Sequence, residues 1–159
     1  MSGGANGWAV AALALCLAGD VFLMLPQDLF VAGLASFLLG HVLFVAGFVA
    51  DYESTTWLPL TAALAIGALA FSARPVLRGA IAEDPALRIP VLAYMGVIGT
   101  MLVVSGVVAS WLAIAGAATF LVSDSVLARN RFVRPFDRGH LATMVTYHAA
   151  LALLVLALV

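Results

Sequence analysis

The feature that most constrains this chain is the length of its uninterrupted apolar runs. A helix needs about 20 consecutive apolar residues to cross the roughly 30 Å hydrocarbon core of a bilayer. Hydrophobic residues make up 65% of the 159-residue chain and charged residues only 9%. Soluble domains instead contain about a quarter charged residues, and the mean hydropathy here is +1.16. The sequence therefore predicts an integral membrane protein.

Six runs are long and apolar enough to span a membrane, and charged residues, proline or glycine separate them. The predicted spans cover residues 8–25, 29–50, 56–72, 90–107, 110–128 and 140–159. Because residues 90–128 are too many for one ordinary span, we expect a tight turn at 105–110. The apolar residues run continuously instead of alternating, which favours helices over a barrel. The predicted fold is an all-α transmembrane bundle of about six helices, forming one domain over residues 1–159.

Small residues at helical spacing predict where these helices approach one another. Gly33, Gly40 and Gly47 recur every seven residues in the second span, and Gly96 and Gly99 lie in the fourth. Glycine lets two membrane helices pack closely. We expect all five glycines to lie at helix-to-helix contacts.

The arginines predict the orientation of the bundle. With six spans, the first, third and fifth connections share one side, and the other connections share the opposite side with both termini. The third and fifth connections contain every arginine, namely Arg74, Arg78, Arg88, Arg129, Arg131, Arg134 and Arg138. The opposite side carries Asp51 and Glu53 and no basic residue. The positive-inside rule then predicts a cytoplasmic arginine side and both termini outside.

The third connection, residues 73–89, is long enough to have structure of its own. It contains Val76, Ile81 and Leu87 among its charged residues. We expect either a short interfacial segment lying along the headgroups or a plain loop.

Charge and cysteine content exclude several classes of function. Eight acidic residues against seven basic ones give a net charge of -1, which excludes a nucleic-acid partner. The single cysteine, Cys16, allows no internal disulfide, and no Cys/His cluster has the spacing of a metal site. The nucleophile-elbow, zinc-hydrolase and nucleotide-loop motifs are absent. The first apolar run follows no basic residue and contains Asp20, so we expect it to be a retained helix and not a signal peptide.

Ionisable residues are rare inside the spans, and each is costly enough there to need a reason. At 1.5 Å per residue, Asp20 and Asp124 both lie roughly 6 to 9 Å below the cytoplasmic boundary, and Tyr94 lies at about 6 Å. Tyr147 and His148 lie somewhat deeper, at roughly 11 to 13 Å. Three further polar residues complete the set, with Ser123 and Asn130 near the level of Asp124 and His41 near the midplane.

Two carboxyl groups at one depth are what acid/base catalysis needs. An apolar pocket disfavours ionisation of the first, and a second nearby raises that cost, so the pair can share one proton. We expect Asp20 and Asp124 to approach within about 8 Å across one cleft, with Tyr94 and His148 near its wall. In the alternative interpretation, each aspartate hydrogen-bonds a neighbouring helix or reaches the headgroups, without a role in catalysis.

Each of the remaining polar residues has a structural interpretation as well as a functional one. His41 either orients a carboxylate or makes a helix-to-helix hydrogen bond. Tyr94 and Tyr147 either support the site or are interfacial aromatics. The arginines of residues 129–138 either bind lipid phosphate or only set the topology.

Five segments, in this order, resemble the YhhN-like lysoplasmalogenase family of membrane proteins. They are AGDVFLML, GLASFLLGHVLFVAGF, PVLAYMGVIGTMLV, FLVSDSVLARNRF and MVTYHAA, and they cover nearly the whole chain from Leu13 onward. The resemblance implies an enzyme that cleaves the vinyl ether bond of lysoplasmalogens without a cofactor or metal. It also implies that Asp20 and Asp124 are the catalytic residues. Compared with the family pattern, the chain is expected to lack an N-terminal helix pair, and Ala150 replaces a glutamine.

Two other functions remain open at this stage. A small proton-coupled transporter would also contain intramembrane acids, although such carriers bind near the midplane and show internal repeats. A lipid-binding scaffold would use the same residues for structure alone. The hydrolase hypothesis requires a lysophospholipid substrate, and Asp20 and Asp124 as its acid and base.

Overall fold

The structure is a computed structural model, and it describes residues 3–158. Within that range it consists of helices without a strand, which confirms the all-α prediction. The six long helices are α1 (Gly3–Met24), α2 (Phe30–Ala50), α3 (Leu58–Glu83), α4 (Arg88–Val104), α5 (Trp111–Phe132) and α6 (Gly139–Leu158), and the short 3₁₀ helices are η1 (Pro85–Leu87) and η2 (Ser105–Val107). Each of the six long helices, α4 together with its flanking turns, is long and apolar enough to cross a membrane.

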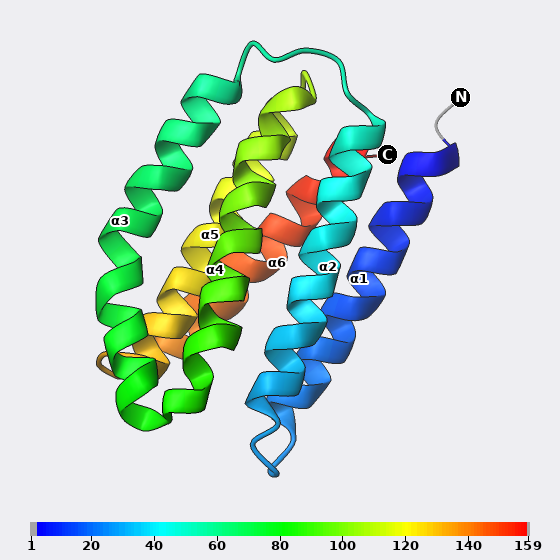
Figure 1. Cartoon of the computed structure of the whole chain (residues 1–159). Helices are drawn as coiled ribbons and strands as arrows, with labels where there is room; N and C mark the ends of the chain where they lie inside the picture. The colour runs from blue at the N-terminus through cyan, green and yellow to red at the C-terminus, as the bar shows by residue number, and fades with distance from the viewer. Residues whose placement is uncertain (1–2, 159) are drawn as a thin grey trace.

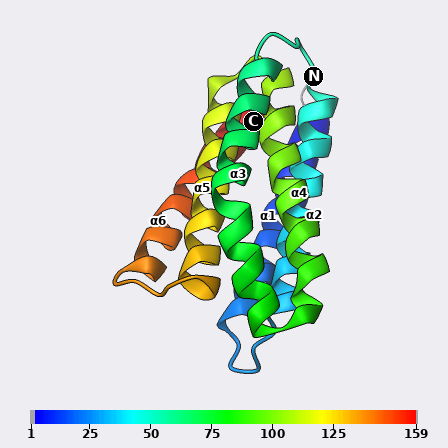
Figure 2. The same cartoon turned by 60° about the vertical axis from the view of Figure 1, so that its left-hand side comes forward.

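The helices form an upright bundle in which neighbours in sequence pack together (Figure 1). Helix α1 packs mainly on α2, α3 on α4, and α5 on α6. Contacts of α2 with α4 and of α3 with α5 join these pairs, whereas α1 and α6 touch only sparsely. Turned by 60°, the bundle has α6 on the outer side of α5 (Figure 2). The α1–α2, α3–α4 and α5–α6 connections lie together at one end, and the start of α1 and the end of α6 lie at the other (Figure 1).

The tight turn predicted at residues 105–110 is confirmed. Helix α4 ends in η2, and α5 begins at Trp111. The Val107 carbonyl accepts hydrogen bonds from the backbone N–H groups of Glu53 and Ser54, at 3.0 and 3.1 Å. The turn is therefore tied to the α2–α3 loop, where backbone groups would otherwise lack partners.

The prediction of a loop or a separate interfacial segment at residues 73–89 is wrong for residues 73–83. Helix α3 continues through residues 73–83 to Glu83, so this stretch is neither a loop nor a separate interfacial segment. The stretch is rich in strong helix formers, and it buries Val76 and Ala80 on one face against Leu87. Helix α5 likewise runs beyond residue 128 to Phe132. The basic residues in these two stretches therefore lie on helices and not in loops.

The predicted glycine contacts are confirmed at four of the five positions. A Cβ atom on Gly33 would lie 2.8 Å from a leucine side chain of α1, and one on Gly40 would lie 3.2 Å from an α1 backbone carbonyl. Gly47 also faces α1, at 3.3 Å, and Gly99 faces a leucine of α3, at 2.8 Å. The prediction is wrong for Gly96, because a Cβ atom there would meet nothing within 4 Å.

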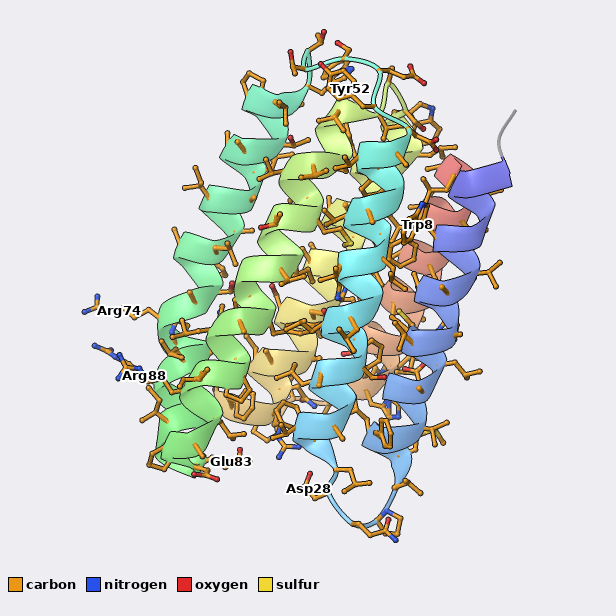
Figure 3. All side chains as sticks on the ribbon, turned by 45° about the vertical axis from the view of Figure 1, so that its right-hand side comes forward. Trp8, Asp28, Tyr52, Arg74, Glu83 and Arg88 are labelled. Carbon is orange, nitrogen blue, oxygen red and sulfur yellow. The ribbon has the colours of Figure 1, made fainter. Side chains whose placement is uncertain are left out.

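The two ends of the bundle differ in chemistry. One end, which we call the arginine end, holds the last turns of α3 and α5, the start of α4 and the α5–α6 loop, and with them all seven arginines. Figure 3 places Asp28, Glu83 and Arg88 at this end and Tyr52 at the opposite end. The tryptophans belong to helix starts at that opposite end, where all three are exposed. This distribution is the pattern of a bundle with two unlike membrane faces.

Close packing of α3 against α5 depends on Gly79. A Cβ atom at Gly79 would overlap the backbone carbonyl of Phe132, which cannot move aside as a flexible side chain can. Gly79→Ala should therefore lower the melting temperature of the detergent-solubilised protein, since overpacking typically costs about 1–3 kcal/mol. Gly67 on the same helix is the matched control, because a Cβ there meets nothing within 4 Å and alanine is the better helix former. Equal melting temperatures for the two variants would contradict this packing.

Candidate active site

An apolar pocket lies inside the arginine half of the bundle and is lined by side chains from all six long helices. Its empty space is about 1000 Å³, a volume that includes the part open to the outside. Most of its wall is apolar, formed by Leu23, Phe30, Leu34, Phe37, Leu69, Val76, Val91, Met95, Ile98, Leu121, Leu127, Ala128, Phe132 and Met144. A site of this shape and lining suits a hydrocarbon chain.

Two carboxyl groups line this pocket, and each is held by a tyrosine from another helix. The Tyr147 hydroxyl of α6 donates a hydrogen bond to Asp20 of α1, at 2.8 Å. The Tyr94 hydroxyl of α4 donates one to Asp124 of α5. Both tyrosines are largely buried, with 9% of Tyr94 and 4% of Tyr147 exposed. A carboxyl oxygen in an apolar wall is costly without a partner, so each tyrosine stabilises the position of its aspartate.

The two aspartates reach one pocket because of where their helices end. Helices α1 and α5 both run toward the arginine end (Figure 1). Asp20 lies about one turn before the end of α1 at Met24, and Asp124 about two turns before the end of α5 at Phe132. Both then line the same pocket. The structure thus brings together the two carboxyl groups that the sequence singled out.

A row of aromatic rings lies behind the two tyrosines. The Tyr147 ring packs edge-to-face on Phe120, with centroids 5.4 Å apart, and Phe120 packs on His41 at 4.5 Å. His41 then packs on Tyr94 at 5.4 Å. His41 is fully buried, does not line the pocket, and neither of its ring nitrogens has a hydrogen-bond partner among residues 3–158. It supports the back of Tyr94 and touches neither aspartate by a hydrogen bond.

Of three other residues predicted to support the site, one lines the pocket and two do not. Ser123 lines the pocket and donates a hydrogen bond to the Thr143 carbonyl at 3.1 Å, joining α5 to α6. Asn130 does not line it; its side-chain oxygen accepts the Phe136 N–H at 3.1 Å and fixes the α5–α6 loop. His148 is exposed, and its Nδ1 lies 2.8 Å from the carbonyl one turn earlier in α6. His148 does not line the pocket, but its ring packs edge-to-face on the ring of Tyr147, which does, with centroids 5.1 Å apart.

The sequence prediction missed Arg131 as a pocket residue. Arg131 lines the pocket and forms ion pairs with Asp28 of the α1–α2 loop, at 3.3 Å, and Glu83 at the end of α3, at 2.8 Å. Its guanidinium also lies 4.0 Å from the centroid of the Phe30 ring. The signal was present, because Arg131 follows Asp124 by seven residues, which is two helical turns. Ending the fifth span at residue 128 concealed it.

The donor groups for a metal centre are not assembled in the part of the chain that the structure describes. Among residues 3–158, no group of three or more His, Cys, Asp or Glu side chains is placed to hold a metal ion. The polar atoms of the pocket are carboxyl, hydroxyl and guanidinium groups.

Fold and pocket together define a multi-pass membrane protein whose bundle encloses two hydrogen-bonded carboxyl groups. The chain belongs to the YhhN family, whose model matches residues 1–158. The resemblance seen in the sequence is thereby confirmed over almost the full chain. No solved structure shows significant similarity to it.

Three curated mammalian relatives have the same name. The chain is 33% identical to lysoplasmalogenase TMEM86B of Homo sapiens, over 98% of this chain and 65% of the human protein. The mouse (Mus musculus) protein of that name is 32% identical, over 97% and 65% of the two chains. The rat (Rattus norvegicus) protein is 33% identical, over 97% and 63%. The chain thus spans less than two thirds of the length of these relatives.

Proposed function

We propose that this chain hydrolyses the vinyl ether bond of lysoplasmalogen-type lysolipids, releasing a fatty aldehyde and a glycerophospho-alcohol. The observation that carries the proposal is the placement of two tyrosine-bonded carboxyl groups, Asp20 and Asp124, in one apolar pocket. The name shared by the three relatives supports the same reaction class. The apolar wall accommodates the alkenyl chain, and the carboxyl groups act on its first two carbons.

The first half of the reaction uses one aspartate as acid and the other as base. The acid transfers a proton to the β-carbon of the vinyl ether, and the α-carbon and ether oxygen share the positive charge as an oxocarbenium ion. The carboxylate stabilises this cation and takes a proton from a water molecule that adds to the α-carbon. Proton transfer by a positioned group typically contributes about 10²- to 10⁴-fold, and a fixed charge beside the cation adds to this.

The second half restores the starting protonation state. The product of water addition is a hemiacetal, whose carbon–oxygen bond to glycerol must break. The aspartate that received a proton from water now delivers one to the departing glycerol oxygen, while the other removes the hemiacetal hydroxyl proton as the aldehyde forms. Each carboxyl group ends as it began, so no cofactor or external acid is consumed.

The orientation of the chain is part of the proposal. Seven arginines at one end of the bundle and none elsewhere in the sequence favour a cytoplasmic arginine end. The pocket lies in that half of the bundle. A lysolipid of the cytoplasmic leaflet would then present its linkage just below the headgroups, at the level of Asp20 and Asp124.

Orientation can be tested with fused reporters. A reporter that is active only outside the cytoplasm should be active when fused after Val159, because the C-terminus is expected outside. A reporter that is active only in the cytoplasm should be inactive there. The same reporter inserted after Arg134, in the α5–α6 loop, should behave as cytoplasmic. Cytoplasmic behaviour of the Val159 fusion would contradict the proposed orientation.

The central test replaces each aspartate by asparagine. Asp20→Asn and Asp124→Asn keep the side-chain volume and an oxygen that accepts the tyrosine hydrogen bond, but neither can exchange a proton. Aldehyde release from a 1-alkenyl lysophospholipid should fall by at least about 10²-fold in each variant. Asp51→Asn, at the opposite end of the bundle, is the matched control and should retain activity.

A saturated 1-alkyl lysophospholipid should yield no aldehyde with any of these proteins, because it lacks the carbon–carbon double bond whose β-carbon is protonated. Full activity in both asparagine variants would contradict the two-carboxyl mechanism and favour a scaffold or another catalytic group. Retained melting temperatures in the inactive variants would exclude unfolding as the cause.

The dependence of activity on pH provides a separate prediction. Below the optimum both carboxyl groups are protonated and the base is lost; above it both are ionised and the acid is lost. The rate of aldehyde release should therefore follow a bell-shaped curve, whose two apparent pKa values belong to the coupled pair and not to either residue. A profile with only one limb would contradict the division into acid and base.

A further inference from the structure

We propose that Arg131, Asp28 and Glu83 form a headgroup subsite for a phosphate linked to an amine. Arg131 would bind the phosphate, and the two carboxylates would bind the ammonium group. This inference deepens the proposed function and rests on it for the identity of the lipid. We call these three residues the charged triad.

The charged triad joins three separate segments at the arginine end, and its Arg131 lines the pocket. Arg131 lies in the last turn of α5, Asp28 in the α1–α2 loop and Glu83 at the end of α3. The guanidinium contacts both carboxylates, at 3.3 and 2.8 Å. The Asp28 and Glu83 side chains are 72% and 41% exposed, whereas that of Arg131 is only 28% exposed. The two carboxylates are therefore more accessible than the Arg131 side chain, which lines the pocket.

Arg131 has a donor group left over. Its Nε atom is buried and has no hydrogen-bond partner among residues 3–158, although its terminal nitrogens contact the two carboxylates. Buried donors are normally paired, and an unpaired one is costly. Arg131 also lines the pocket, so a bound molecule that shifts the side chain enough to expose Nε can supply the missing acceptor oxygen. Arginine is well suited to a phosphate oxygen in that place.

The charges of the triad select the kind of headgroup. One guanidinium and two carboxylates give the triad a charge of -1 when all are ionised, so a bare phosphate would be repelled by Asp28 and Glu83. A headgroup that carries an ammonium group beyond its phosphate replaces this repulsion with attraction. Both exposed carboxylates have free lone pairs for such a donor. The triad is therefore complementary to a zwitterion and not to a simple anion.

The spacing of the triad from the aspartates matches a lysolipid. Arg131 follows Asp124 by seven residues on α5, which is two turns on one helix face and about 10 Å along the axis. In the lipid, seven bonds separate the β-carbon of the vinyl ether from the phosphorus atom. An extended chain advances roughly 1.2 Å per bond, as in a polypeptide backbone, which gives about 8 Å. A lipid whose β-carbon lies at Asp124 thus places its phosphate near the guanidinium.

A purely structural role for the triad predicts a different outcome. Partly exposed ion pairs contribute little to stability, and loss of a helix tie would weaken binding of every ligand alike. A headgroup subsite instead distinguishes ligands by their headgroups. The decisive measurement therefore compares ligands that share one chain.

The probes are three radiolabelled saturated ether lipids of equal chain length, bound to detergent-solubilised protein. One carries phosphoethanolamine, one carries a bare phosphate, and one is an alkylglycerol without a headgroup. None contains a vinyl ether, so binding is measured without hydrolysis. Arg131→Gln should weaken binding of the phosphoethanolamine lipid by at least 10-fold, a factor expected from loss of a charged hydrogen bond, and leave the alkylglycerol unchanged.

Three further variants test the assignment. Arg131→Lys keeps the charge and should lose less affinity than Arg131→Gln. Asp28→Asn combined with Glu83→Gln should reduce the preference for phosphoethanolamine over bare phosphate. Arg88→Gln is the matched control, because Arg88 points away from the bundle at the same end (Figure 3), and it should change none of the three affinities.

Two results would overturn the subsite. One is an equal loss of affinity for the alkylglycerol and the phosphoethanolamine lipid in Arg131→Gln. The other is an unchanged preference between the two phosphate lipids in the double carboxylate variant. Failure of the proposed hydrolysis is distinguishable, since it would appear as absent aldehyde release from the alkenyl lipid while headgroup-dependent binding persisted.

Discussion

A carboxyl group inside a bilayer requires a partner, and this requirement shapes the centre of the molecule. Asp20 and Asp124 are each bonded by a tyrosine of a different helix. These two hydrogen bonds link α1 to α6 and α4 to α5, so the two carboxyl groups of the pocket also help to set the distances between its walls. The rings behind the tyrosines pack edge-to-face through Phe120 and His41. Rigid aromatic support of this kind holds polar groups near a productive geometry.

The arginine end depends on a second constraint, the close approach of α3 to the end of α5. That approach requires Gly79, whose position faces the Phe132 backbone. One turn later, Glu83 reaches Arg131. A small residue of α3 therefore allows Glu83 of the same helix to reach Arg131 of α5, so the charged triad depends on helix packing and not on local sequence alone.

Sequence reasoning predicted the fold and the central pair because both depend on strong, local signals. Six apolar runs specify six helices, and two acids in those runs are conspicuous because they are so costly there. The shared pocket required only helix direction and depth. Helix ends were less predictable, because hydropathy reports where the membrane ends and not where the helix ends. Residues 73–83 and 129–132 stay helical beyond the apolar runs, so Arg131 was not predicted to line the pocket. His148 and Asn130 show the other limit, since facing direction depends on crossing angles that spacing does not give.

Because α1 and α6 contact each other only sparsely, the Asp20–Tyr147 hydrogen bond is one of the few interactions that hold these two helices together. These helices touch at few points, yet one of the two aspartate–tyrosine bonds crosses the seam between them. Any sideways parting of α1 from α6 that admits a lipid from the bilayer must break this bond. Asp20 would then re-form its hydrogen bond with Tyr147 only after the two helices closed again around the bound lipid. Opening of the bundle between α1 and α6 would therefore release one of the two pocket carboxyl groups from its tyrosine.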